Sequence, residues 1–284
     1  MNTFSKYALS ATAGLLLSAS AAAHERFILP SHNALSGDLP QSVSFVASVT
    51  NDFFHPDFPL GNNGGGKVSP FLAKVLEYTN SQIILPNGEV DDDMQWLAMA
   101  RMSVADYEFE QDGTYRIALY QKPTPWITYT DKDGKWGRLV GDVDVPAGAT
   151  DVSKGLISAR TEAYVTVNKP NQEAVKPSGY GLEVIGSVLP NELFVGETVD
   201  FQLFLNGEKL EQENELTITL GETRYRNQRD EMTVKTDAKG RFEIEFEKPG
   251  RYLLHVENTQ DNEKGSEYDY TYHSLFLTLD VFPE

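Results

Sequence analysis

Residues 42–49 read Ser-Val-Ser-Phe-Val-Ala-Ser-Val, and this stretch indicates the fold class. Apolar side chains recur in it with a period of two residues, which is typical of a β-strand that buries one face. The same alternation recurs at residues 115–120, 163–167, 199–205, 216–220, 242–246, 252–256 and 275–281. Beyond residue 23 no stretch of a dozen residues carries a helical stripe, and the best helical candidate, 71–78, reads equally well as a strand.

Turn signals separate these strands at short intervals. They are Pro-Asn-Gly at 86–88, Asp-Gly at 133–134, Asn-Gly at 206–207 and Lys-Gly at 239–240. Many short strands with turns at close spacing are typical of β-sandwiches. The sequence therefore predicts an all-β protein.

An internal repeat indicates how the strands are grouped. Residues 109–115 (Phe-Glu-Gln-Asp-Gly-Thr-Tyr) match residues 246–252 (Phe-Glu-Lys-Pro-Gly-Arg-Tyr) at Phe, Glu, Gly and Tyr. The match is either a true repeat or a hairpin solution reached twice, and both interpretations give each half its own antiparallel sheet.

A polar stretch with two prolines at 169–179 has the composition of a linker. We therefore predict an N-terminal β-sandwich domain at 24–168, a linker at 169–179, and an immunoglobulin-like β-sandwich domain at 180–284.

The first 23 residues have the features of a secretory signal peptide. Lys6 supplies a positive charge, residues 8–19 are apolar, and Ala21-x-Ala23 is an acceptable cleavage site. The apolar stretch is too short to span a membrane as a helix. We expect export, cleavage after Ala23, and a periplasmic location in a Gram-negative cell.

Composition excludes several classes of function. Twenty-four Lys and Arg against 42 Asp and Glu give a net charge of −18, which disfavours nucleic acids and anionic membrane surfaces as partners and suits cations. The absence of cysteine excludes disulfides, thiolate metal sites and cysteine nucleophiles.

Catalytic motifs are not found. Residues 61–68 imitate a phosphate-binding loop, but Val68 stands where a hydroxyl is required. Residues 131–134 lack the further ligands of a calcium loop, and neither a Gly-x-Ser-x-Gly nor a His-Glu-x-x-His motif occurs. We therefore expect a protein that is not an enzyme.

His24 becomes the first residue if cleavage follows Ala23. An N-terminal histidine offers an α-amine and an imidazole Nδ1 that chelate one ion, and a second imidazole would complete a histidine brace. Imidazole suits copper, nickel and zinc, and copper is favoured by the Irving–Williams order. The alternative is that cleavage falls elsewhere and His24 merely follows an alanine-rich tail.

His55 and His32 are the candidates for a further metal ligand. His55 lies in an aromatic loop close in sequence to Asp52 and Asp57, whose carboxylates could orient it or share the ion. His32 comes eight residues after His24, at the end of the expected first strand. Either residue is equally readable as a surface loop side chain.

The other two histidines are interpreted as structural. His255 alternates with apolar residues and stands beside Glu257, so we expect it on a solvated face. His273 precedes the apolar residues of the last strand, and we expect a strand-end residue there.

The chain resembles a known family along essentially the whole mature sequence. The resemblance rests on residues 24–32, 113–116, 181–184, 189–197, 224–226, 235–242 and 279–283. These stretches resemble the family called "domain of unknown function 4198", whose members are exported bacterial proteins often described as periplasmic components of nickel or cobalt uptake. The resemblance implies His24 as the first mature residue and a membrane transporter component as a partner.

The resemblance also has one departure. Residues 188–191 read Val-Leu-Pro-Asn where many members have Thr-His-Pro-Asn, so no ligand role for that family histidine is carried over.

We thus expect a periplasmic protein that binds a divalent transition metal, nickel, cobalt or copper, through His24, His55 and His32. The expected partners are the metal ion and a membrane transporter component, without nucleic acid and without direct membrane insertion.

Two other functions stay open. The chain could be a non-enzymatic interaction module that binds a protein or glycan through loops such as 52–67, which we expect to be mobile because it is rich in glycine. Trp96, Trp126 and Trp136 are then candidate contacts, unless they are buried in the sandwiches. Copper-dependent oxidative chemistry at a histidine brace is the third function.

Overall fold

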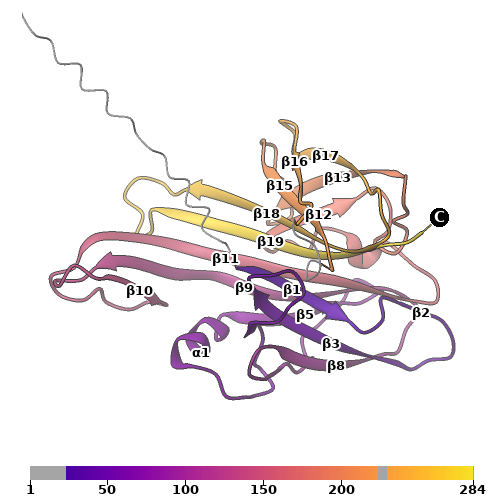
Figure 1. Ribbon diagram of the computed structural model, residues 1–284, viewed down its shortest axis with the longest axis horizontal. Coiled ribbons are helices and arrows are strands. Elements are labelled where there is room, and N and C mark those ends of the chain that lie inside the picture. The colour runs from indigo at the N-terminus through magenta and orange to yellow at the C-terminus, as the bar shows by residue number, and fades with distance from the viewer. Residues whose placement is uncertain (1–23, 223–228, 284) are drawn as a thin grey trace, which may run out of the picture.

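Three β-sheets stacked in layers make up the protein (Figure 1). The structure, a computed structural model, describes residues 24–222 and 229–283, so the predicted signal peptide lies outside the described residues. Strands dominate and only two short helices occur in the described chain, which confirms the all-β prediction.

The first layer, here called the N-terminal sheet, has the order β1-β3-β8-β7, with β4 also paired to β3. Its strands are β1 (Glu25–Pro30), β3 (Gln41–Thr50), β4 (Phe58–Pro59), β7 (Leu97–Ala98) and β8 (Ser103–Phe109). The stretch at 42–49 lies within β3, where its buried residues alternate with exposed ones over the first half of the strand.

The middle layer, here called the shared sheet, has the order β16-β15-β18-β19-β11-β9-β5-β6, with β10 paired to β9 and β2 paired to β11. Its strands are β2 (Ala34–Leu35), β5 (Thr79–Ile84), β6 (Val90–Asp91), β9 (Gly113–Thr130), β10 (Trp136–Val140), β11 (Thr150–Val167), β15 (Glu215–Leu220), β16 (Met232–Lys235), β18 (Gly250–Asp261) and β19 (Tyr270–Val281).

The third layer, here called the C-terminal sheet, consists of four strands. They are β12 (Leu182–Gly186), β13 (Thr198–Leu205), β14 (Glu208–Lys209) and β17 (Arg241–Glu245). The helices are α1 (Pro70–Leu76) and the 3-10 turn η1 (Glu173–Val175). Ser69 caps α1 by accepting a hydrogen bond from the backbone of Leu72, and Pro70 stands at the first position of the helix. The stretch 71–78, which could have been a helix or a strand, is therefore helical as far as Leu76.

One continuous sheet links the two halves of the chain. Strand β19, near the C-terminus, runs parallel to β11 of the first half, in register from Gly155 opposite Tyr270 to Glu162 opposite Leu277. The two cores lie on opposite faces of this shared sheet, because successive side chains of a strand point to opposite faces. Tyr164 belongs to the core under the C-terminal sheet, whereas its neighbours Ala163 and Val165 belong to the core under the N-terminal sheet.

The repeated sequence forms the same local structure twice. The hydroxyl of Tyr115 donates to the carbonyl of Gln111 at 2.9 Å, and that of Tyr252 donates to the carbonyl of Lys248 at 2.8 Å. Each tyrosine ring meets a phenylalanine ring edge-on, Phe109 and Phe246 respectively.

Both hairpins turn at a glycine, Gly113 or Gly250, whose φ of +137° or +139° is unfavourable for a residue with a Cβ. The repeat is therefore structural as well as sequential.

The predicted linker is held against the first half by buried charges. Arg116 Nη1 lies 2.5 Å from Glu183 Oε1, and Arg116 Nη2 donates to the carbonyl of Lys176 at 2.8 Å. Arg160 pairs with Glu162 beside them, and all four charged side chains are fully buried. Arg160 Nη1 also donates to the carbonyl of Tyr180 at 3.1 Å, and the Ser178 amide donates to Glu183 at 2.9 Å. The residues between β11 and β12 are thus held by hydrogen bonds to these buried side chains.

The glycine-rich loop is also tied down. The Gly64 amide donates to the carbonyl of Trp96 at 2.9 Å, and the Asn63 side chain accepts from the Trp96 amide at 2.8 Å and donates to the carbonyl of Met94 at 2.8 Å. These hydrogen bonds argue against the mobility expected for the glycine-rich part of the 52–67 loop, because asparagine side chains and the neighbouring backbone satisfy its polar groups.

Candidate metal site beside strand β1

His24 immediately precedes β1, at the edge of the N-terminal sheet. Because Glu25 pairs with Thr50 of β3, His24 comes beside the loop that follows β3. Its Nδ1 lies 2.9 Å from Oδ1 of Asn51, and its ring meets the exposed ring of Phe58 edge-on at 6.4 Å. The position is open to solvent, so the imidazole is accessible.

The loop carries a negative charge next to His24. The backbone and side-chain amides of Asn51 each donate to Oδ2 of Asp57 at 3.0 Å. These hydrogen bonds lower the pKa of Asp57, and the charges of Arg101 and His24 lower it further. Asp57 is therefore an anion throughout the physiological pH range.

His55 is held by the same loop. Its backbone amide donates to the carbonyl of Asp52 at 3.0 Å, and its Nδ1 lies 3.2 Å from Oδ2 of Asp52. The Thr50 hydroxyl contacts the carbonyls of both residues, which closes the turn. One loop thus presents an imidazole and two carboxylates beside His24.

His32 lies elsewhere. It follows the other end of β1, and its Nδ1 is 3.3 Å from the hydroxyl of Ser31. A strand advances about 3.3 Å per residue, so the six residues of β1 separate His24 from His32 by roughly 20 Å. His24 and His32 cannot bind the same ion in this arrangement.

The side chains do not form a complete ligand set. Across residues 24–222 and 229–283, no three His, Asp or Glu side chains are grouped so that they could hold one metal ion. Metal binding here needs a donor beyond the side chains, and the α-amine that cleavage after Ala23 would create at His24 is such a donor.

His255 is buried, so the prediction of a solvated position is wrong. It does face away from the core of its own half, but β1 covers that face of the shared sheet, where Phe27, Phe53, Leu253 and Phe276 form a third apolar cluster. Its ring stacks on Phe276 with 4.2 Å between the centroids. A periodicity argument within one half could not detect this covering strand.

Two carboxylates flank the imidazole of His255. Nδ1 lies 3.5 Å from Oε2 of Glu25, and Nε2 lies 3.3 Å from Oε1 of Glu257, which also accepts a hydrogen bond from the Tyr272 hydroxyl. Burial raises the pKa of Glu25, whereas the hydrogen bond from His255 lowers the pKa of Glu257. No local sequence signal identifies Glu25, because its role depends on contact with a strand more than 200 residues away.

The three tryptophans and His273, which the sequence also singled out, differ in how far they are buried. Trp96 is fully buried and donates to Ser81, Trp126 is half-buried, and Trp136 is 67% exposed. His273 is buried within β19, and burial lowers its pKa. Only Trp126 and Trp136 therefore remain available as surface contacts.

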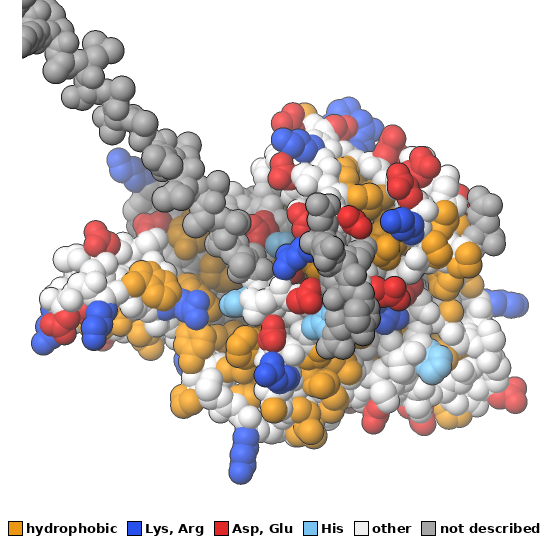
Figure 2. Space-filling model, viewed as in Figure 1, with side chains coloured by type: hydrophobic (Ala, Val, Ile, Leu, Met, Phe, Trp, Pro, Cys, Tyr) orange, Lys and Arg blue, Asp and Glu red, His pale blue; other side chains and the backbone are white. Residues whose placement is uncertain are grey.

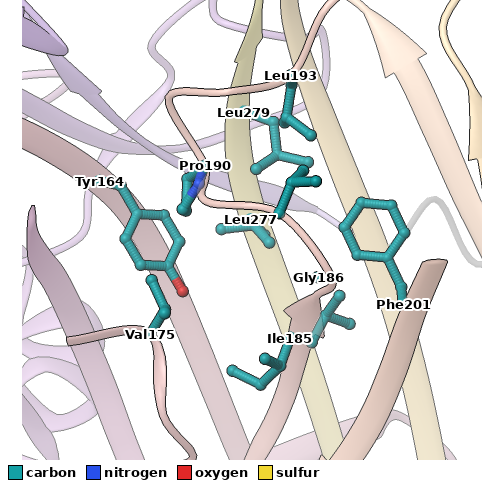
Figure 3. Close-up of a pocket in the computed structure, with 11 residues that line it drawn as sticks. Tyr164, Val175, Ile185, Gly186, Pro190, Leu193, Phe201, Leu277 and Leu279 are labelled. Atoms are coloured by element: carbon teal, nitrogen blue, oxygen red, sulfur yellow. The ribbon is translucent and has the colours of Figure 1, made fainter. Parts of the chain in front are cut away.

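An apolar cavity under the C-terminal sheet is too small for a ligand (Figure 3). Tyr164, Leu277 and Phe201 are among its lining residues, and its volume is about 20 Å³. A single water molecule needs a space of this order, so the cavity is a packing gap.

A family match covers most of the chain. The sequence model of the family described as "Domain of unknown function (DUF4198)" matches residues 21–260. No match was found among curated proteins. No helix in the described part of the chain has the length and apolar character needed to cross a membrane.

Similar solved structures include three of very low sequence identity. Trypsin-activated alpha-2-macroglobulin from Escherichia coli is 11% identical with a TM-score of 0.25, and the match covers 90% of this chain but only 16% of that one. The FN1–FN3 domains of chicken CNTN1 are 8% identical (TM-score 0.23, 91% and 99% covered). A DUF3823 family protein from Bacteroides uniformis is 10% identical (TM-score 0.23, 91% and 100% covered).

Proposed function

The chain belongs to the family described as domain of unknown function 4198, and we propose that its mature form is a periplasmic protein that binds a divalent transition-metal ion through His24. The α-amine and Nδ1 of this residue form the chelate, and nickel, cobalt or copper is the ion. Imidazole and amine nitrogens suit these metals, and copper(II) is favoured over the other two by the Irving–Williams order.

The pairing of β1 with β3 supports this proposal more than any other observation. It sets His24 beside the loop at 51–57, where Nδ1 already contacts the Asn51 amide oxygen at 2.9 Å. A metal ion at Nδ1 displaces this amide, whose side chain keeps its second hydrogen bond, to Asp57. The exchange breaks one exposed hydrogen bond, a small cost beside a metal–nitrogen bond.

His55 is the further ligand in this proposal. It belongs to the loop beside His24, and Asp52 at 3.2 Å orients its ring through Nδ1, which leaves Nε2 for the ion. A ligand from the folded loop makes metal binding depend on folding. His32, at the far end of β1, is excluded from this site.

The charge of the protein favours cations. Lys6 is the only charged residue among residues 1–23, so removal of this segment changes the net charge from −18 to −19. A negative surface raises the local concentration of cations and speeds their encounter, most strongly at low salt. The ionised Asp57 adds a local charge at the site.

Delivery of the ion to a membrane transporter component is the role that we propose for the bound metal. It rests on the resemblance of the chain to proteins described as periplasmic components of nickel or cobalt uptake. The alternative role, with the same ligands, is the handling of periplasmic copper. The test below distinguishes the two roles by showing which of the three metals binds most tightly.

Calorimetric titration of copper(II), nickel(II) and cobalt(II) tests the site. The natively processed protein is compared with His24→Ala, His55→Ala and the matched control His32→Ala. We expect the first two changes to weaken binding by about tenfold or more and the control to leave it unchanged. Equal affinity in His24→Ala would contradict the proposal.

A further inference from the structure

A cluster of three aromatic rings and one arginine lies where α1 meets the β9–β10 hairpin (Figure 1). It consists of Phe71 of α1, Trp126 of β9, and Trp136 and Arg138 of β10, and we call it the aromatic–arginine platform. Trp136 and Arg138 share one face of β10, since they stand two residues apart in a strand.

The rings hold the guanidinium of Arg138 in place. Its central carbon lies 4.6 Å from the ring centre of Phe71, 4.8 Å from that of Trp126 and 5.9 Å from that of Trp136. Phe71 and Trp126 in turn meet edge-on at 6.2 Å. Three cation–π contacts restrict the rotamers of a flexible side chain, so the guanidinium is positioned before any ligand arrives.

This guanidinium has no anionic partner in the part of the chain that the structure describes. Two other exposed arginines do have one: Arg101 lies 3.4 Å from Asp57, and Arg241 lies 2.8 Å from Asp237. An arginine without a carboxylate is unexpected in a protein with 42 acidic residues. Its five N–H donors remain available for an external acceptor.

Two rings of the platform are exposed, and Arg138 supplies its positive charge. Trp136 is 67% exposed and Phe71 is 42% exposed, although such large apolar side chains are usually covered. The adjoining turn carries two lysines and two aspartates, Lys132, Lys135, Asp131 and Asp133, so it adds no net charge beside Arg138. Figure 2 shows hydrophobic side chains together with both basic and acidic ones over this part of the molecule.

We propose that the aromatic–arginine platform binds a sugar that carries a carboxylate, such as a uronic acid unit of an oligosaccharide. The planar fork of Arg138 matches a carboxylate with two parallel hydrogen bonds. The C–H groups of a pyranose ring carry partial positive charge and pack against the negative face of an indole, which Trp136 offers.

A sugar fits these features better than an acidic peptide does. Peptides are bound by strand pairing or by recesses that receive their side chains. The platform instead offers flat ring faces beside a single charged fork, which suits a rigid ring with one carboxylate. The net charge of −18 also disfavours a long polyanion and leaves a short acidic saccharide as the ligand.

The test is titration of the full mature protein with tetragalacturonate, followed by calorimetry and tryptophan fluorescence. The fully methyl-esterified tetramer has the same rings without the charges, and tetraglutamate has the charges without the rings. The variants are Arg138→Gln, Arg138→Lys and Trp136→Ala, with Arg241→Gln as the matched control on the other half of the molecule. Circular dichroism checks that each variant is folded.

We expect tetragalacturonate to bind with a Kd of about 1 mM or below. Arg138→Gln and Trp136→Ala should each weaken binding about tenfold, Arg138→Lys should weaken it because a point charge lacks the fork, and Arg241→Gln should not change it. The methyl ester should bind at least about tenfold more weakly than the free acid.

Three outcomes would overturn the proposal: no binding of tetragalacturonate in the millimolar range, equal binding of its methyl ester, or equal binding by Arg138→Gln. Equally tight binding of tetraglutamate with the same dependence on Arg138 would also overturn it and would identify the platform as a contact for an acidic protein.

Discussion

Glu25 Oε2 and His255 Nδ1 lie 3.5 Å apart where strand β1 crosses the shared sheet. Both side chains are about nine-tenths buried, and the contact joins the first strand of the mature chain to the C-terminal half. The residue next to His24 is therefore anchored in the interior of the protein. His24 directly precedes this strand, so a metal ligand there adjoins a rigid element, which favours tight binding.

The burial of Glu25 gives the stability of the protein a pH dependence. Its folded pKa is raised by burial, so the folded protein binds this proton more tightly than the unfolded chain does. Stability must then fall as the pH rises through the window from about 4.5 to the folded pKa. In Glu25→Gln this fall should be absent, as measured by urea unfolding at a series of pH values.

Glu257→Gln is the matched control, because its pKa is shifted in the opposite direction. The hydrogen bond from His255 lowers the pKa of Glu257, so its contribution is present above about pH 4.5 and is lost as the pH falls through the folded pKa. Glu257→Gln should therefore lose stability at neutral pH. If the free energy of unfolding depended on pH in the same way in both variants, the pKa values of the two carboxyl groups would not be shifted in opposite directions.

The buried ion pairs should be costly to break. Arg116→Met leaves Glu183 buried with Arg160 as its next nearest cation, at 3.9 Å, and should lower the free energy of unfolding by about 3–5 kcal/mol. A second change, Glu183→Gln, should recover part of this loss because it removes the uncompensated charge. Chemical denaturation measures both.

The exposed pair of Arg241 and Asp237 supplies the control for the buried pairs. Arg241→Gln should cost less than about 1 kcal/mol, since water screens the interaction. A similar cost for Arg116→Met would mean that the cluster is open to water.

The shared sheet predicts that both halves unfold together. Leu277 is buried under the C-terminal sheet, and Leu277→Ala should cost about 2–5 kcal/mol. All three tryptophans belong to the first half, yet their fluorescence transition should shift as much as the far-ultraviolet circular dichroism does. Val143→Ala, at an exposed position, is the control. If Leu277→Ala left the midpoint of the fluorescence transition unchanged, the two halves would unfold independently.

Local pattern was sufficient to predict the strands. Alternation at 42–49 and at 275–281 lies within β3 and β19, and the repeated Gly-x-Tyr turn forms twice, because both depend on residues close in sequence. The parallel pairing of β11 with β19 has no such signal, since its partners lie more than 100 residues apart. The burial of His255 by β1 was missed for the same reason.

The structure brings only some of the residues of the predicted metal site near one another. His24 and His55 come close to one loop because a strand pair ends there, which the sequence suggested through His55 and its neighbouring aspartates. His32 stands at the end of the first strand, as expected, and for that reason the full length of the extended β1 separates it from His24.

The glycine-rich loop offers a further test. The Gly64 amide donates to the carbonyl of Trp96, and the Asn63 side chain binds the amide of Trp96 and the carbonyl of Met94, so we expect strong hydrogen-exchange protection of Gly64 without any ligand. Asn63→Ala should lower this protection and cost about 1–3 kcal/mol. Asn87→Ala, in an exposed turn, should leave it unchanged, and rapid exchange of Gly64 in the parent protein would show that the loop is open.

The most direct measurement of the central claim compares two forms of the protein that differ by one residue. One begins at His24 with a free α-amine, and the other carries a methionine before His24. We predict that the extra residue weakens copper(II) and nickel(II) binding by at least about tenfold, because it removes the amine from the chelate while every side chain stays in place. Equal affinities of the two forms would contradict the account.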